Sequence, residues 1–389
     1  MRKLLKAIKS ALDMARAAKS VYKRSYLGQI RDIWRLKRVN PTCGISDYYW
    51  YQMPLRRPGA DSDYTNYLGW RAQRDLSAYL NPRFAITPAK DKLLFTVLAE
   101  TYGIPTAKIK GAFKPLGPVP AFIPHAMGSI AEVRAFLENP EIYPVFVKPS
   151  CGARGVGGFL LLGLDEDRGE VVSKTGEQLS IDDFIARSID NPKRELYRRE
   201  SGYLFQEVVR QHAEIAAFAG TEVPSGMRII VYLEDDGPVL HRAVWKLAAP
   251  GNANDNFGMG RYGNLIADVD LETGTVQCAV DGMPPNCHFL DRHPVTGRLF
   301  SDFRFPLWEE TKAQVLAASV AFPMLRMQHW DVVLTDNGPI FLELNDLGAT
   351  EMIQINGRPI LDSRIKALLR DRGGLPPDSK LRKLVEQGV

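Results

Sequence analysis

The sequence has no apolar run long enough to span a membrane, and its cysteines are few. A span needs roughly 18 consecutive apolar residues, whereas Lys6 and Lys9 interrupt the N-terminal apolar positions, which also argues against a signal peptide. The four cysteines show neither CxxC spacing nor paired histidines, so no zinc site or disulfide framework is indicated. We therefore expect a soluble, cytoplasmic protein with reduced thiols.

Familiar catalytic and nucleotide-binding signatures are also missing. The sequence contains no GxxxxGKS/T loop and no GxGxxG leading into a helix, which disfavours the two folds built on those motifs. No Ser/His/Asp or Cys/His constellation stands out, and His293, next to Pro294, is interpreted as a turn residue rather than a base. The sequence thus offers no dedicated nucleophile.

Charge is unevenly distributed along the 389 residues. The formal net charge is +5, but residues 1–40 hold twelve basic and two acidic residues, a charge of +10, so the remainder carries −5. A mildly acidic body argues against a nucleic-acid-binding protein. Within residues 1–40, which we call the basic leader, apolar residues recur at helical spacing and predict a basic amphipathic helix. Such a helix either packs on the body or contacts an anionic membrane surface or an acidic partner.

The segment Gln328–Asp346 predicts a hairpin that gathers oxygen ligands. Apolar and polar residues alternate on both sides of Asp336-Asn337-Gly338, which is suited to a short loop. With that three-residue loop, Asp331 pairs with Glu343, and Asn345 lies on the same face because side chains two apart point the same way. Two carboxylates and a carboxamide suit a hard cation such as Mg²⁺. The alternative is an ordinary polar outer face.

The opposite face of this hairpin is expected to pack inward. It would carry Ile340, Leu342 and Leu344, which alternate with the polar positions.

A glycine-rich stretch follows a strand that is expected over Pro144 to Lys148. The sequence VFVKPSCGARGVGGFLLL places Lys148 at the strand end and Gly152, Gly155 and Gly157 in the loop behind it. Glycines let backbone amides approach oxyanions closely, so the loop is suited to fold over a polyphosphate above the lysine.

Upstream, Thr87-Pro88 predicts the start of a helix that runs to Gly103. Lys90 and Lys92 would lie in its first turn, where cations oppose the helix dipole, so an anion is expected nearby unless they are plain surface lysines.

A second hairpin and a long loop carry further cations. The hairpin around Asp235-Asp236-Gly237 would place Arg228, Arg242 and Lys246 on one face, as an anion platform or as a solvated edge. The loop Pro250–Asn264 is too long for a plain connection and contains Asp255, Asn256 and Arg261.

The order of these elements resembles the ATP-grasp superfamily. The likeness is closer to its sugar-transfer-associated branch, also described as related to alpha-L-glutamate ligases, through DYYWYQMP, DNFGMGRYGNLIADVDLETG, HPVTG and HWDVVLTDNGPIFLELN. It extends from about Leu27 to Leu361. The resemblance implies an α+β fold in which two lobes with antiparallel sheets clamp ATP, plus an N-terminal helical extension.

The resemblance also implies a division of the chain. Residues 1–40 form the basic leader and residues 41–84 an aromatic segment, which covers a core edge or lines an acceptor groove. Residues 85–203 form the N-terminal lobe with the phosphate loop, and residues 204–375 the C-terminal lobe with the metal site. Residues 376–389 are a tail with a short surface helix. The leader and the aromatic segment stand where related ligases have a substrate domain.

Roles for individual residues follow from the same resemblance. The implied ATP-binding residues are Lys92, Lys148, Gly152, Gly155, Gly157, Gln206, Glu207, Val209 and Glu214. Arg228, Lys246, Asn256 and Arg261 resemble catalytic groups that stabilise transferring phosphoryl and acyl-phosphate oxygens. Asp331, Glu343 and Asn345 resemble ligands of one or two Mg²⁺, for which Mn²⁺ is a substitute.

The implied activity is that of an ATP-dependent carboxylate–amine ligase. ATP would phosphorylate a small-molecule or peptide carboxylate, and an amine would displace phosphate to leave an amide and ADP. The alternatives are a small-molecule or sugar kinase on the same fold and a nucleotide-binding module without catalysis.

Overall fold

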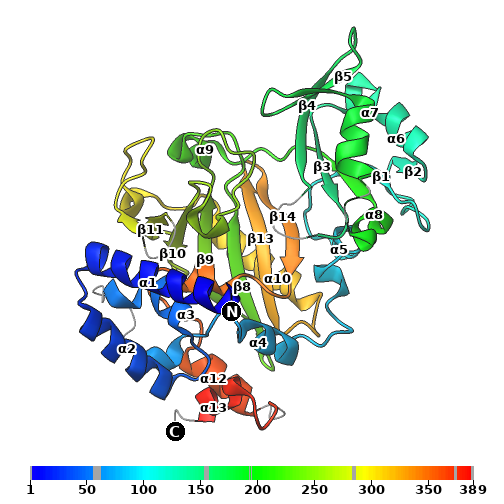
Figure 1. Ribbon diagram of the computed structural model, residues 1–389. Coiled ribbons are helices and arrows are strands. Elements are labelled where there is room, and N and C mark those ends of the chain that lie inside the picture. Colours follow the sequence, from blue (N-terminus) through cyan, green and yellow to red (C-terminus); the bar gives the residue numbers. More distant parts are fainter. Residues whose placement is uncertain are drawn as a thin grey trace.

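The computed structural model describes residues 2–55, 63–152, 157–191, 193, 195–282, 286–371 and 375–386. It has two lobes (Figure 1), and each lobe is built on a seven-stranded sheet. This arrangement confirms the expected α+β class and the helical N-terminus. The N-terminal lobe has the strand order β2-β1-β7-β3-β4-β5-β6, and the C-terminal lobe has the order β12-β11-β10-β9-β8-β13-β14.

The N-terminal lobe is antiparallel except between β1 and β2. Its strands are β1 (Ile109–Phe113), β2 (His125–Met127), β3 (Val145–Pro149), β4 (Phe159–Asp165), β5 (Glu170–Ser173), β6 (Gln178–Ser180) and β7 (Tyr203–Gln206). Helices α6 (Ile130–Leu137), α7 (Ile181–Phe184) and α8 (Leu196–Ser201) accompany them. Apolar side chains of α6 and α7 pack with those of the sheet into one core. That core fixes β3 and its terminal lysine.

The sheet of the C-terminal lobe is wholly antiparallel. Its strands are β8 (Met227–Glu234), β9 (Gly237–Leu247), β10 (Leu265–Val269), β11 (Val276–Asp281), β12 (His288–Leu290), β13 (Met327–Thr335) and β14 (Gly338–Asn345). One face of this sheet, which we call the α10 face, packs against α5 (Lys92–Thr101), α9 (Ala213–Ala219) and α10 (Trp308–Val320). The opposite face of the sheet, which we call the α12 face, packs against α4 (Gln73–Leu80), α11 (Thr350–Gln354), α12 (Ser363–Asp371) and α13 (Lys380–Glu386). Both faces of this sheet therefore pack against helices.

The aromatic segment covers a core edge, one of the two arrangements expected from its sequence. Helices α1 (Arg2–Tyr22), α2 (Tyr26–Val39) and α3 (Ile45–Trp50) share a small core with its tyrosines. Its backbone is bound to the C-terminal lobe by Gln354, which donates to the carbonyl of Leu68 at 2.9 Å and accepts from its amide at 2.8 Å.

The packing divides the chain differently from the sequence-based boundaries. Helix α5 was assigned to the N-terminal lobe, yet Phe95 and Ala99 lie in the core of the C-terminal lobe. The C-terminal helix α13 is not a plain surface helix, because Leu381 and Leu384 are fully buried in the core beneath α12.

The helix expected from Thr87 begins later. A short 3₁₀ turn covers Thr87–Ala89, and α5 starts at Lys92, where Asp91 caps it by accepting from the amides of Leu93 and Leu94. An aspartate N-cap prevails over the threonine–proline pair. Lys92 is consequently the first residue of the helix, and Lys90 precedes it.

Both predicted hairpins have a two-residue turn instead of three. In the hairpin of β13 and β14, Thr335 pairs with Gly338, one position away from the expected register. A bulge after Asp331 restores the pair of Asp331 with Glu343. The bulge also changes which side chains face the α10 core: Phe341 is buried, whereas Ile340 and Leu342 remain partly exposed. The β8–β9 hairpin behaves alike, with a bulge after Ile230.

Candidate active site

Three charged residues lie in a row across adjacent strands of the α12 face. Asp331 in β13 is opposite Arg228 in β8 and opposite Glu343 in β14. Arg228 donates from Nε to Oδ1 of Asp331 at 2.8 Å and from Nη2 to Oδ2 at 2.7 Å. Both side chains are almost fully buried, so this bidentate pair is shielded from solvent.

Lys246 and Asp255 extend this row into a cluster of buried ions. The Lys246 Nζ lies 3.4 Å from Asp331 Oδ1 and 3.3 Å from Asp255 Oδ2. The amide of Gly226 donates to Asp255 at 2.9 Å and fixes the loop that carries it. Asp255 was recognised in the sequence as part of the long loop, but catalytic roles were expected only for Asn256 and Arg261 of that loop.

The charges of the cluster support one another. Burial alone would raise the pKa of Asp331, but Arg228 and Lys246 hold it well below its usual range. Burial opposes the charged form of Lys246, yet Asp255 and Asp331 leave its pKa above the ordinary value. For Asp255 burial prevails and raises the pKa, although Lys246 acts against it. Asp331 is thus a stable anion and a weak base.

Two lysines lie at the edge of this cluster: Lys92, the first residue of α5, and Lys148, in β3 of the N-terminal lobe. Lys92 Nζ lies 3.5 Å from Glu343 Oε2 and donates to the carbonyl of Gly152 at 2.9 Å. Its amide donates to the carbonyl of Ser150 at 3.0 Å, which fastens the start of α5 to the end of β3. Burial and the charge of Lys92 lower the pKa of Lys148 to about 8, against the attraction of Glu343. Glu343 thus pairs with Lys92 and acts on the charge of Lys148.

The oxygen ligands predicted for Mg²⁺ lie together and fit a hard cation. Asn345 donates to Glu343 Oε1 at 3.2 Å, and Asp331 faces Glu343 across the hairpin. Within the described ranges no three His, Cys, Asp or Glu side chains form a metal site by themselves. These side chains would therefore form only part of a Mg²⁺ ligand shell, which phosphates and water would complete. Nearby, Lys90 pairs with Asp346, a partner that was not predicted.

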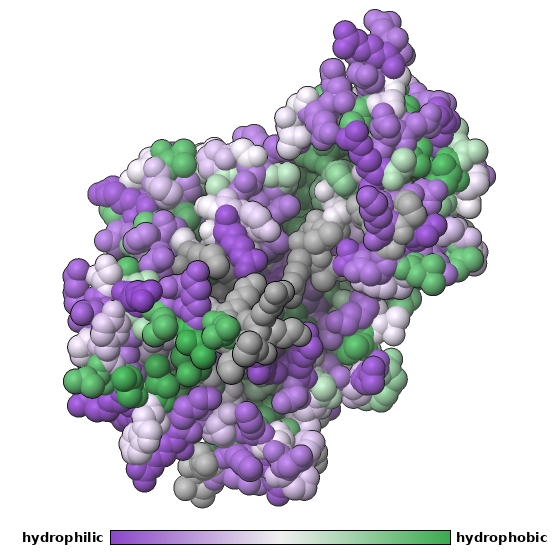
Figure 2. All heavy atoms as spheres, viewed as in Figure 1, coloured by the Kyte–Doolittle hydropathy of each residue, from purple (hydrophilic) through white to green (hydrophobic). Residues whose placement is uncertain are grey.

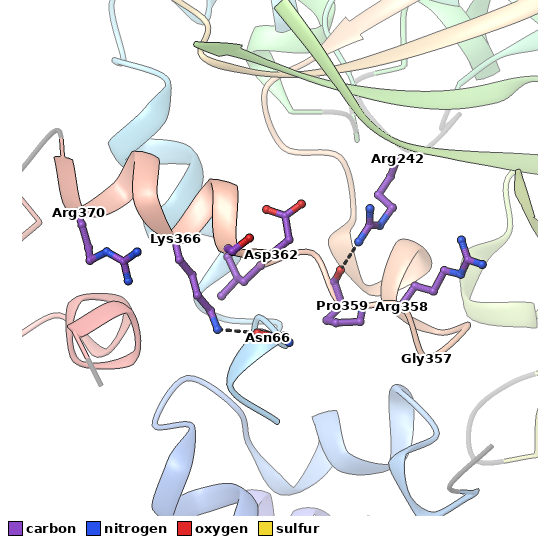
Figure 3. A pocket seen from close by; sticks show the side chains of 10 residues that line it. Asn66, Arg242, Gly357, Arg358, Pro359, Asp362, Lys366 and Arg370 are labelled. Atoms are coloured by element: carbon purple, nitrogen blue, oxygen red, sulfur yellow. Dashed lines mark hydrogen bonds between the residues drawn. The ribbon is translucent and has the colours of Figure 1, made fainter. Parts of the chain in front are cut away.

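Arg242 does not join the expected cationic platform. Figure 3 shows it at a separate hollow of about 650 Å³ beside Arg358, Lys366 and Arg370. Its Nη2 donates to the carbonyl of Pro359 at 2.9 Å. Arg228 and Lys246 share the face as expected, but their charges are neutralised by Asp331 and Asp255 of the same chain.

Four further residues expected to bind ATP lie on the connection between the lobes. Gln206 ends β7 and donates to the carbonyl of Ala107 at 3.2 Å. Glu207 exchanges backbone and side-chain hydrogen bonds with Lys108, which holds the connection close to β1. Val209 is half-buried, and Glu214 is exposed in the first turn of α9.

The other expected contributors are more peripheral. Asn256 caps its own loop by accepting from the amide of Gly258 at 3.2 Å, and Arg261 is exposed. Gly155 lies outside the described residues, while Gly152 and Gly157 flank that gap, and Gly157 has a φ of +86° that favours glycine.

His329 is a buried neighbour of the cluster that sequence reasoning missed. It is completely buried, and burial together with Arg228 lowers its pKa to about 3, so the ring is neutral. Gly348 packs on the ring so closely that a Cβ there would lie 1.9 Å from Nδ1. The carbonyl of Gly348 also accepts from Arg228 at 3.0 Å. Only glycine fits between the imidazole and the guanidinium.

Comparison with known proteins places this geometry in a family. The sequence model of the sugar-transfer associated ATP-grasp family matches residues 71–369, well over half of the chain. The chain belongs to this family. A search of curated protein sequences gave no match.

Several solved structures are similar at low identity. The D-Ala:D-Ser ligase VanG from Enterococcus faecalis has 13% identity and a TM-score of 0.38, with 79% of this chain and 64% of that chain covered. D-alanyl-alanine synthetase A from Vibrio cholerae has 12% identity and a TM-score of 0.37, with 78% and 66% covered. N5-carboxyaminoimidazole ribonucleotide synthetase in complex with ADP has 11% identity and a TM-score of 0.36, with 72% and 52% covered. The matched region thus spans between half and two thirds of those chains.

The buried pair predicts a strong coupling between Arg228 and Asp331. Arg228→Met or Asp331→Leu should each lower the free energy of unfolding by about 3–5 kcal/mol, because each leaves a buried charge without its main partner. The double variant should lose less than the two single losses added together. Urea unfolding followed by circular dichroism measures all three values.

An exposed ion pair provides the control. Arg187→Met with Glu177→Leu removes a pair of which both side chains are more than half exposed, so that cycle should show a coupling below about 1 kcal/mol. Additive losses at Arg228 and Asp331 would contradict a mutually dependent pair.

Proposed function

We propose that this protein is an ATP-dependent carboxylate–amine ligase that releases ADP and phosphate. The observation that carries the proposal is that Lys148 of the N-terminal lobe and Lys92, which is bonded to both lobes, lie near Glu343 of the C-terminal lobe. Lysines on one side suit a polyphosphate, and carboxylates on the other suit the Mg²⁺ that accompanies it. Membership of an ATP-grasp family supports the same choice of nucleotide.

Each side chain then has a task that its surroundings permit. Lys92 and Lys148 would bind phosphate oxygens. Glu343, Asn345 and the outer lone pairs of Asp331 would hold the cation. When bound, Mg²⁺ neutralises charge on the transferring phosphoryl group. Arg228 acts chiefly by holding Asp331 in place, because its three hydrogen bonds go to Asp331 and Gly348.

The state of the buried carboxylates favours a carboxylate as the group that is phosphorylated. A hydroxyl acceptor needs a base to remove its proton, whereas a carboxylate is already a nucleophile at neutral pH. Arg228 holds Asp331 as a weak base. The pKa of Asp255 is raised, but its carboxylate is engaged by Lys246 and by the amide of Gly226. Arg261, exposed on the same long loop as Asp255, is free to reach an acyl-phosphate oxygen.

The low pKa of Lys148 predicts proton uptake on nucleotide binding. With a pKa of about 8 this amine is half neutral near pH 8. Bound phosphates would raise its pKa toward the unperturbed value. ADP should therefore bind with uptake of about half a proton at pH 8 and almost none at pH 6. Calorimetry in two buffers of different ionisation enthalpy, without metal, measures the uptake.

A lysine remote from the cluster provides the control for this measurement. Lys148→Met should abolish the uptake, and Lys312→Met, on the far side of α10, should retain it. Equal uptake in the wild type and Lys148→Met would place the phosphates elsewhere.

The acyl phosphate can be intercepted chemically. With ATP, Mg²⁺, hydroxylamine and pools of amino acids or peptides as carboxylates, a hydroxamate should form together with ADP. Arg261→Gln should lower its rate by roughly 10²-fold, the scale expected when one oxyanion-stabilising donor is lost. Arg83→Gln, an exposed arginine outside the site, is the matched control. A hydroxylamine-stable phosphorylated product would instead identify a kinase.

A further inference from the structure

Helix α2 exposes a stripe of apolar side chains to solvent. Leu27, Ile30 and Trp34 recur at intervals of three and four residues and are 81%, 63% and 63% exposed. The opposite side of the helix faces the protein with the buried residues Gln29, Asp32 and Leu36. A helix that served only to cover a core would leave no such apolar stripe on its outer side.

The buried polar residues are fully engaged, so this orientation is built in. Arg24 binds both carboxylate oxygens of Asp32 at 2.9 Å, and the hydroxyl of Tyr48 donates to Asp32 at 3.0 Å. The hydroxyl of Tyr49 donates to Gln29 at 2.9 Å. These bonds hold α2 in the orientation in which Leu27, Ile30 and Trp34 face outward.

Helix α1 extends the apolar surface. Leu5, Ile8 and Leu12 also recur at intervals of three and four residues and are 59%, 49% and 51% exposed. Figure 2 shows apolar residues gathered over α1 and α2 on the face in view. We call these six residues the α1–α2 patch. Patches of this kind mark interaction sites rather than ordinary surface.

Cations surround the patch. Among the described side chains between Leu5 and Val39, eight exposed residues are basic, and the one exposed acid is Asp13. At about 100° per residue, Arg31 and Arg38 lie on one side of the α2 stripe and Lys37 on the other. The guanidinium of Arg38 lies 5.5 Å from the ring centre of Trp34. Apolar side chains between cations are the composition of a helix that lies in a membrane interface.

We propose that the α1–α2 patch docks this protein on an anionic lipid surface. The apolar stripes enter the headgroup region, and the cations contact lipid phosphates. Within the described part of the chain no helix is long and apolar enough to cross a membrane, so the contact is peripheral. A second copy of the chain is a poorer occupant, because two patches of the same positive charge repel each other.

Sedimentation of the full chain with vesicles tests this proposal. At about 0.1 M salt the protein should sediment with vesicles containing about one third phosphatidylglycerol and not with pure phosphatidylcholine, and about 0.5 M salt should release it. Leu27→Ser with Trp34→Ser should lower the partition coefficient at least tenfold. Arg31→Gln with Arg38→Gln should lower it by roughly tenfold or more.

Matched variants at other exposed positions separate docking from general stickiness. Phe84→Ser with Leu162→Ser replaces side chains that are 76% and 48% exposed, and this variant should bind vesicles like the wild type. Arg168→Gln with Arg187→Gln should do the same. All variants should keep the wild-type melting temperature. No binding to anionic vesicles, equal binding by neutral ones, or a salt-insensitive dimer lost on changing Trp34 would overturn the proposal.

Discussion

The candidate site depends on one buried interaction, the bidentate pair between Arg228 and Asp331. Strands β8 and β13 lie side by side, so the two residues are direct neighbours in the sheet. Each charge removes most of the other's desolvation penalty, and Lys246 with Asp255 completes the balance. Because the pair occupies the middle of the row, it sets the position of Glu343 on the next strand. The cluster therefore has its shape before any ligand binds.

The second constraint is the junction between the lobes. Lys92 belongs to a helix whose apolar side packs in the C-terminal lobe, while its amide is bound to Ser150 at the end of β3. One residue is thereby fixed relative to both sheets. The carbonyl of Pro105 accepts from the amide of Phe341 at 2.8 Å and adds a second link. A phosphate chain bound between Lys148 and Glu343 would lie at this junction.

Local pairing could be predicted from the sequence, and long-range pairing could not. The hairpin alternation predicted Asp331 opposite Glu343 although the turn has two residues, because the bulge shifts the register back. Nothing local indicates that β8 lies beside β13, so the contact of Arg228 with Asp331 was missed. The outward position of the α2 apolar stripe depends on hydrogen bonds from Tyr48 and Tyr49 of α3. Asp255 could not be separated from Asn256, because its partners Lys246 and Gly226 lie on other elements of the folded lobe.

The central claim is that Glu343 helps to bind a metal–nucleotide complex at the junction of the lobes. The most direct measurement is the thermal unfolding of the wild type and Glu343→Gln with ATP alone and with ATP and Mg²⁺. Mg²⁺ should raise the wild-type melting temperature beyond ATP alone, since a ligand at 100 times its Kd stabilises by about 2.7 kcal/mol, and Glu343→Gln should lose this increment. Glu309→Gln, whose exposed carboxylate pairs with Lys312 on α10, should keep it. An undiminished Mg²⁺ increment in Glu343→Gln would contradict the assignment of the site.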